Sequence, residues 1–184
     1  MKYDVPALFL DRDGVVNKNH GYVFEISKFE FHPEIFEICL IGKSAGMPIM
    51  IVTNQSGIGR GYFSESEYQR LTQWMISEFK SQGIAINDVF HASENPESKH
   101  VSIPERRKPS PEMFFEAAKI FDLNLANSVM IGDNESDMVA AQRAGVEHRI
   151  LIGHPDGSTV ASDSAADHQQ CIEILRKIVS GIQE

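Results

Sequence analysis

Two aspartates spaced two positions apart, Asp11 and Asp13, are the residues of this chain best suited to chemistry. They follow the apolar run 5–10 and precede Gly14, which places them at the end of an expected buried strand. Unpaired carboxylates at such a place would repel each other and lose hydration. A bound cation would relieve that repulsion, and a reacting phosphate would use both acids. The alternative is a solvated turn, because Asp and Gly are common turn residues.

A phosphate monoester would give each aspartate its own role. Asp11 would attack the phosphorus atom and form an aspartyl-phosphate, while Asp13 would protonate the leaving alkoxide and later activate water. Mg²⁺ prefers oxygen ligands, and Asp133, which follows another apolar run, would help Asp11 to bind it. The Thr53 hydroxyl and the Lys108 ammonium would stabilise charge on the transferred group. Taken singly, Thr53, Lys108 and Asp133 fit an ordinary turn or surface equally well.

The elements that would position these residues alternate between short β-type runs and amphipathic segments. Alternation of this kind predicts a doubly wound, Rossmann-like α/β fold, a parallel sheet covered on both faces, and 184 residues suit one domain, 1–184. We expect strands at 7–10, 49–52, 88–91, 129–131 and 149–152, and helices at 33–44, 64–82, 110–121, 135–143 and 171–182. Ligands of such folds bind at the carboxyl ends of the strands, where Asp11, Thr53 and Asp133 would meet.

Two long connections, 17–32 and 91–108, flank the expected site, and long connections in compact domains are usually functional or disordered. Little chain remains for a large cap domain. We therefore expect a capless site whose selectivity depends on its long loops. The polar stretch 153–167 is expected to be a surface excursion, and Cys39 and Cys171 are expected to be buried thiols.

Composition excludes some classes of partner. The chain has 17 Lys and Arg residues against 26 Asp and Glu residues, a net charge of −9, which argues against nucleic acid and anionic membranes. No apolar stretch approaches the ~18 residues that cross a bilayer, and no signal-peptide pattern is present. We therefore expect a cytoplasmic protein whose anionic substrate is held by a metal ion and a few Arg and Lys residues.

Four motifs together resemble those of the haloacid dehalogenase superfamily of aspartate-nucleophile phosphotransferases. They are Asp11-x-Asp13-Gly14, Thr53, Lys108 and Gly132-Asp133-x-x-x-Asp137. The resemblance implies Mg²⁺ dependence, with Asp11 as nucleophile and Asp13 as acid and base. It also implies that the Asp11 carboxylate, the Asp13 backbone carbonyl and Asp133 hold the metal. Thr53 and Lys108 would assist catalysis, and Asp137 would pair with Lys108.

Longer segments, 11–17, 20–23, 53–61 and 107–109, resemble the heptose bisphosphate phosphatases, which are related to the histidinol-phosphate phosphatases. The resemblance implies a phosphorylated sugar as substrate, D-glycero-D-manno-heptose 1,7-bisphosphate, which would lose its C7 phosphate and keep its C1 phosphate. A second phosphate needs a second cationic site, and the forked donors of Arg107 and Arg60 suit it. The substrate-binding residues implied are Asn19, His20, Gly21, Tyr22, Thr53, Asn54, Gln55, Ser56, Arg107, Lys108 and Asn134.

The connection 91–106 departs from that resemblance. Heptose phosphatases and many relatives carry a Cys/His zinc site there, whereas this connection contains no cysteine. A structural zinc ion usually needs several thiolates or imidazoles. We therefore expect no structural zinc at His91 and His100, and a connection held by ordinary packing and its two prolines.

Two alternatives stay open. Within the same chemistry the substrate would be histidinol phosphate or another small phosphomonoester, although Gln55-Ser56-Gly57 with Arg60 favours the sugar. In another class, a non-catalytic binding module or a phospho-acceptor receiver domain also gathers acidic residues around Mg²⁺ on a doubly wound sheet. Asp13 argues against a receiver, because a stable phospho-switch has no use for a general acid.

Overall fold

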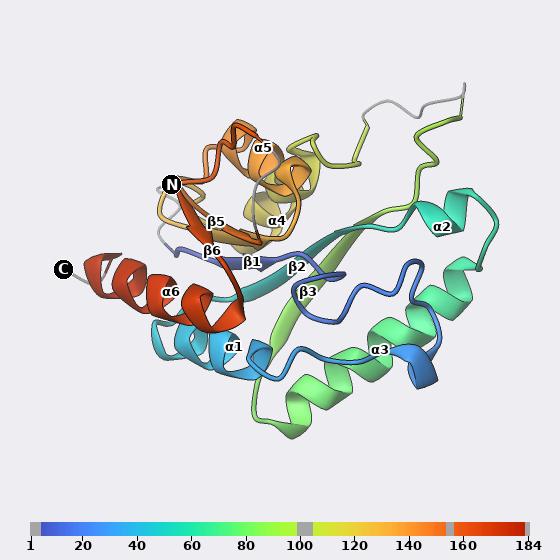
Figure 1. The fold of residues 1–184 in the computed structure, drawn as a ribbon, viewed down its shortest axis with the longest axis horizontal. Helices are drawn as coiled ribbons and strands as arrows, with labels where there is room; N and C mark the ends of the chain where they lie inside the picture. Colours follow the sequence, from blue (N-terminus) through green and yellow to red (C-terminus); the bar gives the residue numbers. More distant parts are fainter. Residues whose placement is uncertain (1–4, 99–104, 154–156, 183–184) are drawn as a thin grey trace.

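The computed structural model describes residues 5–98, 105–153 and 157–182, in which six parallel strands form one sheet of order β3-β2-β1-β4-β5-β6 (Figure 1). The strands are β1 (Leu8–Leu10), β2 (Ile49–Asn54), β3 (Ile86–Ala92), β4 (Val129–Gly132), β5 (His148–Ile152) and β6 (Asp163–Ala165). The helices are α1 (Ile35–Ser44), α2 (Ser56–Gly59), α3 (Glu65–Ser81), α4 (Glu112–Phe121), α5 (Glu135–Arg143) and α6 (His168–Ile182), with a 3₁₀ turn η1 (Ile26–Lys28).

Helices cover both faces of the sheet, as the predicted doubly wound fold requires. Figure 1 shows α1, α3 and α6 on one face and α4 and α5 on the other. Side chains alternate along a strand, so Leu8 and Leu10 enter the core beneath the first group, whereas Phe9 enters the core beneath the second. Both faces of β1 are therefore apolar and buried. Polar residues begin only at Asp11, directly after the strand ends.

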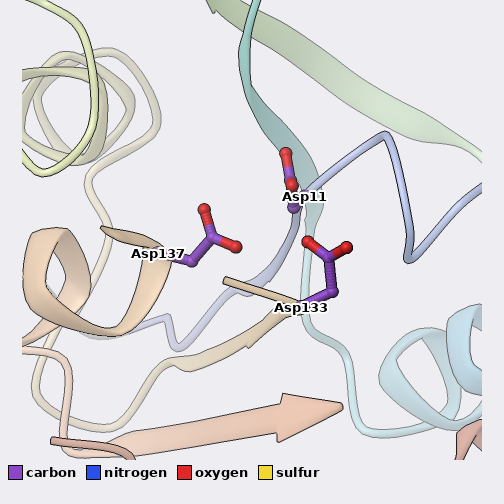
Figure 2. Close-up of side chains that lie close together, drawn as sticks. All are labelled: Asp11, Asp133 and Asp137. Atoms are coloured by element: carbon purple, nitrogen blue, oxygen red, sulfur yellow. The ribbon is translucent and has the colours of Figure 1, made fainter. Parts of the chain in front are cut away.

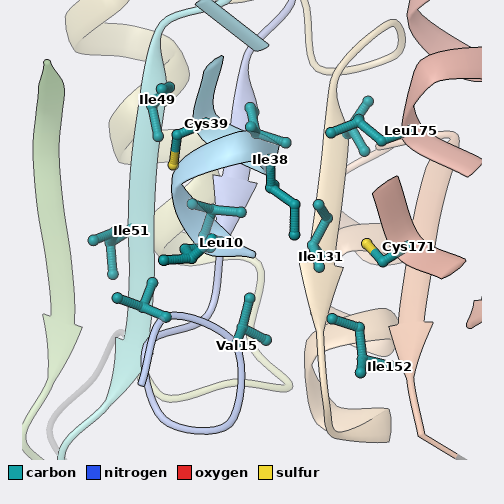
Figure 3. Packing of buried hydrophobic residues seen from close by; sticks show 14 of the residues in the cluster. Leu10, Val15, Ile38, Cys39, Ile49, Ile51, Ile131, Ile152, Cys171 and Leu175 are labelled. Carbon is teal, nitrogen blue, oxygen red and sulfur yellow. The ribbon is translucent and has the colours of Figure 1, made fainter. Parts of the chain in front are cut away.

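The core beneath α1 and α6 includes the two cysteines. Figure 3 shows Cys39 and Ile38 of α1, and Cys171 and Leu175 of α6, turned toward the strands. Both thiols are free and buried, as expected from the sequence. Burying a side chain such as Leu175 stabilises the fold by roughly 1.5–3 kcal/mol. These helices anchor the face of the sheet opposite α4 and α5.

The helix α3 begins at the predicted capping box. The Ser64 hydroxyl accepts a hydrogen bond from the Glu67 N–H, and the Glu67 carboxylate accepts one from the Ser64 N–H. These reciprocal bonds satisfy two backbone N–H groups, those of Ser64 and Glu67, that a bare helix start leaves unpaired.

Within the described ranges, no helix is long and apolar enough to span a bilayer.

The polar stretch 153–167, which was expected to be a surface excursion, contains a strand. Residues Asp163–Ala165 form β6, which pairs in parallel with β5 from Ile150 to Ile152. The expectation was wrong because these three residues lack the β-branched and aromatic side chains that mark strands. Backbone pairing with β5 at the sheet edge, rather than intrinsic preference, forms this strand. The helix α6 likewise begins at His168, three residues before the expected Cys171.

The sheet order reverses between β1 and β4, which lie side by side although four α-helices and two strands separate them in the sequence. The chain leaves β1 toward β2 on one side and reaches β4 on the other. A crevice at the carboxyl ends of the strands is expected at such a reversal, and ligands of doubly wound folds bind there.

Candidate active site

A cavity of about 250 Å³ opens at this reversal, beyond the carboxyl ends of β1, β2 and β4. Polar side chains dominate its walls, and most of them were predicted from the sequence. The lining residues are Asp11, Asp13, Asn19, Tyr22, Thr53, Asn54, Gln55, Ser56, Arg107, Lys108, Asp133, Asn134, Ser136 and Asp137. Segments far apart in the sequence therefore converge on one site, although the roles assigned to them stay predictions.

Lys108 is the cation at the floor of this cavity, and it is almost fully buried. Its Nζ donates to Oδ1 of Asp11 at 2.8 Å and to the Val52 carbonyl at 2.8 Å. The same atom lies 2.7 Å from Oδ1 of Asp137. Three oxygen partners fix the ammonium, and burial between two carboxylates strengthens each ion pair relative to a solvated one. The predicted pairing of Asp137 with Lys108 is therefore present in the structure.

Three carboxylates crowd around this single ammonium. Asp11 follows β1, Asp133 follows β4 and Asp137 lies in the first turn of α5, as Figure 2 shows. Potential metal-binding atoms of the three lie within 4.8 Å of one another. Burial, with repulsion from Asp137 and Asp133, raises the pKa of Asp11 to about 8 despite the opposing effect of Lys108. Burial and Asp137 likewise raise the pKa of Asp133 to about 6.

The Asp137 carboxylate has both of its oxygens occupied. Oδ1 lies against Lys108, and Oδ2 accepts the Asn134 backbone N–H at 3.1 Å as part of the capping box of α5. Asp11 and Asp133 are the other two carboxylates of the group that could hold a cation. Asp137 instead fixes the ammonium and the start of α5.

The Asp13 carboxylate faces a separate group of donors. Nη2 of Arg12 lies 2.9 Å from both of its oxygens, Asn17 Nδ2 donates to Oδ1 at 3.1 Å, and Gln55 Nε2 donates to Oδ2 at 2.8 Å. Arg12 is itself held by the Val23 carbonyl at 2.7 Å. Asp13 therefore stands apart from the cluster around Lys108, which suits a different role for each aspartate of the first motif.

Arg12 and Asn17 were not among the residues predicted for the site. Both are fully buried, and a buried arginine between two aspartates is unusual unless it is paired. The position of Arg12 between Asp11 and Asp13 was the available signal in the sequence. Gln55, predicted to bind substrate, also donates to Thr53 Oγ1 at 2.9 Å, so it links Asp13 to the hydroxyl at the end of β2.

Asn54 holds Lys108 by its backbone. Its Oδ1 accepts the Lys108 N–H at 2.9 Å, and its Nδ2 donates to the Lys108 carbonyl at 3.1 Å. Both hydrogen-bonding groups of the Lys108 backbone are therefore paired with one side chain from the end of β2. This contact connects the predicted polar segment 53–56 directly to the segment that carries the Lys108 ammonium.

Gly14 allows a close approach between the first and fourth motifs. Its φ of +94° lies in the region that favours glycine, and a Cβ added there would lie 1.9 Å from Oδ2 of Asp133. Only a residue without a side chain fits both constraints. The glycine of the first motif thus makes room for the Asp133 carboxylate.

Three predicted substrate-binding residues do not line the cavity, and two of these are paired with other residues. The His20 imidazole lies 3.6 Å from a Glu30 carboxylate oxygen, and Arg60 forms two hydrogen bonds with Glu97 at 3.0 and 3.2 Å. Gly21 has a positive φ of +73°, consistent with a turn beside Tyr22, which does reach the cavity. The contribution of these three residues to binding stays a prediction.

Of the two histidines in the connection 91–106, His91 lies in the part that the structure describes. The His91 ring lies 3.1 Å from the Glu65 carboxylate and packs against Tyr68. His100 lies outside the described residues. The expectation that this chain carries no structural zinc therefore stays a prediction.

Comparison with known proteins gives consistent matches. The sequence model of a family described as "HAD-hyrolase-like" matches residues 105–171. The D-glycero-alpha-D-manno-heptose-1,7-bisphosphate 7-phosphatase of Burkholderia mallei is 45% identical over 163 residues, covering 87% of this chain and 86% of that protein. The D-glycero-beta-D-manno-heptose-1,7-bisphosphate 7-phosphatase of Vibrio cholerae is 42% identical over 150 residues, covering 80% and 81%.

A solved structure matches over almost the same extent. It is the D,D-heptose 1,7-bisphosphate phosphatase of B. bronchiseptica in complex with magnesium and phosphate, with a TM-score of 0.78 and 25% sequence identity. The match covers 94% of this chain and 99% of that one. The similarity in fold therefore extends over almost the whole of both chains.

Proposed function

This chain belongs to the haloacid dehalogenase superfamily of phosphatases, and from that premise we propose that it removes the C7 phosphate of D-glycero-D-manno-heptose 1,7-bisphosphate. The observation that carries the proposal is the buried ammonium of Lys108 between Asp11 and Asp137, beside Asp133. A nucleophilic carboxylate, countercharge and a separate acid are thereby gathered in one small polar cavity.

Mg²⁺ is the proposed cofactor, and the residues present fit it. Asp11 and Asp133 supply hard carboxylate oxygens, and together with Asp137 they place three carboxylates beside the one ammonium of Lys108. When bound, the ion would neutralise charge on the substrate phosphate and position it. By resemblance to the family, the Asp13 backbone carbonyl would be a further ligand. The magnesium in the B. bronchiseptica structure supports this choice of ion.

The phosphoryl chemistry follows from the two aspartates. A carboxylate oxygen of Asp11 attacks phosphorus, and the bond from phosphorus to the C7 oxygen breaks as the new one forms. Asp13 gives its proton to the departing alkoxide. Asp13 then takes a proton from water, whose oxygen attacks the aspartyl-phosphate and releases inorganic phosphate. Lys108 and the Thr53 hydroxyl stabilise the charge on the transferred group in both steps.

Arg107 is the proposed partner of the C1 phosphate. It lines the cavity, and its Nη1 is buried without a hydrogen-bond acceptor among the described residues. A buried guanidinium donor without an acceptor is costly, and a phosphate oxygen would supply one. The retained phosphate would then hold the sugar with its C7 end toward Asp11.

Phosphate release from a substrate panel tests this proposal. The panel contains both C1 anomers of heptose 1,7-bisphosphate, heptose 1-phosphate and histidinol phosphate, with Asp11→Asn as the inactive control. We expect one equivalent of phosphate from the bisphosphate, with the C1 phosphate retained in the ³¹P NMR spectrum, and little release from the other two. Faster turnover of histidinol phosphate than of either bisphosphate anomer would show that the proposed substrate is wrong.

A further inference from the structure

Arg106 precedes Arg107 and contacts three separate segments. Its Nε and Nη2 donate to the two carboxylate oxygens of Glu116 at 2.9 and 2.6 Å. Its Nη1 donates to the His91 carbonyl at 2.9 Å, and its backbone N–H donates to Oε1 of Glu94 at 3.2 Å. One residue thus uses four donors, three of them from the guanidinium fork, which favours a fixed orientation.

These contacts join the two ends of the connection that leaves β3. His91 lies near the end of β3, Glu94 follows that strand, and Glu116 is in α4. Arg106 therefore brings the returning chain back to its point of departure and ties it to a helix. The sequence had predicted a connection held by packing and prolines, and these polar contacts are additional to that expectation. We call the contacts of Arg106 with His91, Glu94 and Glu116 the Arg106 clasp.

Arg107 lies between this clasp and a second anchor. On the other side, the Lys108 backbone is bound at both its N–H and its carbonyl by Asn54. The Arg107 side chain, by contrast, has a buried Nη1 without a partner in the described part of the chain. The residues on both sides of Arg107 are therefore held, Arg106 by its clasp and Lys108 by Asn54, and these two anchors restrict where the Arg107 side chain enters the cavity.

We propose that Arg106 is a positioning residue that holds Arg107 in place for the second phosphate of the substrate. This inference rests on the proposed function, because a substrate with one phosphate would not use Arg107 in this way. Both partners of the Arg106–Glu116 ion pair are about one-third exposed, at 35% and 39%, so water screens the pair and its contribution to global stability is small. Loss of the Arg106–Glu116 ion pair instead weakens substrate binding, because a displaced Arg107 guanidinium no longer reaches the oxygens of the second phosphate.

The test compares Arg106→Ala with Arg176→Ala, which removes another exposed ion pair, that of Arg176 with Glu37 between α6 and α1. Both variants are assayed on heptose 1,7-bisphosphate and on p-nitrophenyl phosphate, a small monoester without a second phosphate. We expect Arg106→Ala to raise KM for the bisphosphate about tenfold, a loss of about 1.4 kcal/mol, with kcat almost unchanged. Turnover of the small monoester, and both reactions of Arg176→Ala, should match the wild type.

Two further variants separate positioning from general support of the fold. Glu116→Ala should also raise KM for the bisphosphate, and the double variant Arg106→Ala/Glu116→Ala should be no worse than Arg106→Ala, because both changes break the same ion pair. An unchanged KM for the bisphosphate in Arg106→Ala would overturn the inference. So would equal losses on both substrates accompanied by a large fall in Tm, which indicate a structural role. Wild-type enzyme that hydrolyses the monoester but not the bisphosphate would instead refute the proposed function.

Discussion

Lys108 and Asp11 are 97 positions apart in the sequence, yet the Lys108 ammonium nitrogen lies 2.8 Å from Oδ1 of Asp11. Closure of this distance depends on the parallel arrangement of β1 and β2 and on the contact of Asn54 with the Lys108 backbone. Burial lowers the pKa of Lys108, but Asp11 and Asp137 together favour the charged ammonium by more, so the pKa of Lys108 is raised above its usual value. The site therefore favours the charged form of Lys108, which serves both the fold and the proposed chemistry.

Replacing this cation should damage stability and activity together. Lys108→Met keeps an unbranched side chain but leaves Asp11 and Asp137 buried without their countercharge. Breaking one partner of a buried ion pair typically costs about 3–5 kcal/mol, which would be measured by urea unfolding. Lys119→Met is the matched control, because Lys119 is exposed on α4. If the two variants had the same free energy of unfolding, the structural role of the Lys108 ammonium would be contradicted.

The two aspartates of the first motif should respond differently to an isosteric amide. Asp11→Asn removes the nucleophile and should lower kcat by at least roughly 10⁴-fold, whereas Asp13→Asn removes only the acid and base and should cost about 10²–10⁴-fold. Asp122→Asn serves as the control, because Asp122 is exposed at the end of α4 and its positive φ of 53° suits Asn. Phosphate release, with circular dichroism to verify folding, measures all three.

The order of severity is the informative part of that experiment. Undiminished turnover in Asp11→Asn would remove the assigned nucleophile. Turnover in Asp13→Asn should recover most with an ester whose leaving group needs no protonation, such as p-nitrophenyl phosphate. A loss in Asp13→Asn of the same size for every leaving group would mean that Asp13 is not the general acid.

The positions of the strands and of the acidic motifs were predictable because apolar runs and turn residues are local features. All five strands expected from the sequence are present; Asp11 and Asp133 directly follow β1 and β4, and Thr53 is the second-last residue of β2. The strand β6 escaped prediction because its Asp-Ser-Ala sequence has no local preference for extended structure. Pairing with β5 decides its conformation, and pairing depends on the rest of the fold.

Side-chain pairing within the site was harder to predict than membership of the site. Gln55 was predicted to bind substrate, yet in the structure it donates to Asp13 and Thr53. Arg106 was not distinguished from its neighbours, because its partner Glu116 is one of many acidic residues on predicted helices. A sequence gives the type and order of charged residues. The choice among many possible partners is made by distances in the folded chain.

The response to Mg²⁺ should depend on pH. Burial, above all, raises the pKa of Asp11 from 3.8 to about 8 and that of Asp133 to about 6. The metal-free folded chain therefore holds these protons more tightly than the unfolded chain does. The stability that the folded chain gains from holding these two protons is fully present below about pH 4. It is lost as pH rises through about 6, where Asp133 titrates, and about 8, where Asp11 titrates.

Mg²⁺ competes with the same protons for Asp11 and Asp133. The rise in Tm on adding a fixed excess of Mg²⁺ should therefore be small near about pH 5 and grow toward about pH 8. Differential scanning fluorimetry at constant ionic strength measures it, with Asp133→Asn as the variant in which the rise should be much reduced at every pH. An increase in Tm that is independent of pH would mean that these two carboxylates do not bind the ion.

Gly14 offers a sharper test of the link between the first and fourth motifs. Gly14→Ala places a Cβ at a position 1.9 Å from Oδ2 of Asp133, in addition to straining a backbone with φ of +94°. Gly83→Ala is the matched control, because its φ is +73° and a Cβ there meets nothing within 4 Å. Both variants should lose roughly 1–2 kcal/mol of stability from backbone strain. Only Gly14→Ala should also displace the Asp133 carboxylate.

That displacement should appear in the Mg²⁺ dependence of turnover. We expect the Mg²⁺ concentration that gives half-maximal phosphate release to rise at least about tenfold in Gly14→Ala and to stay at the wild-type value in Gly83→Ala. Excess Mg²⁺ should restore part of the activity of Gly14→Ala, because the ligand is displaced rather than removed. If the two variants needed the same concentration of Mg²⁺, the close approach of Gly14 to Asp133 would have no bearing on metal binding, and Asp133 would lose its proposed place beside Asp11.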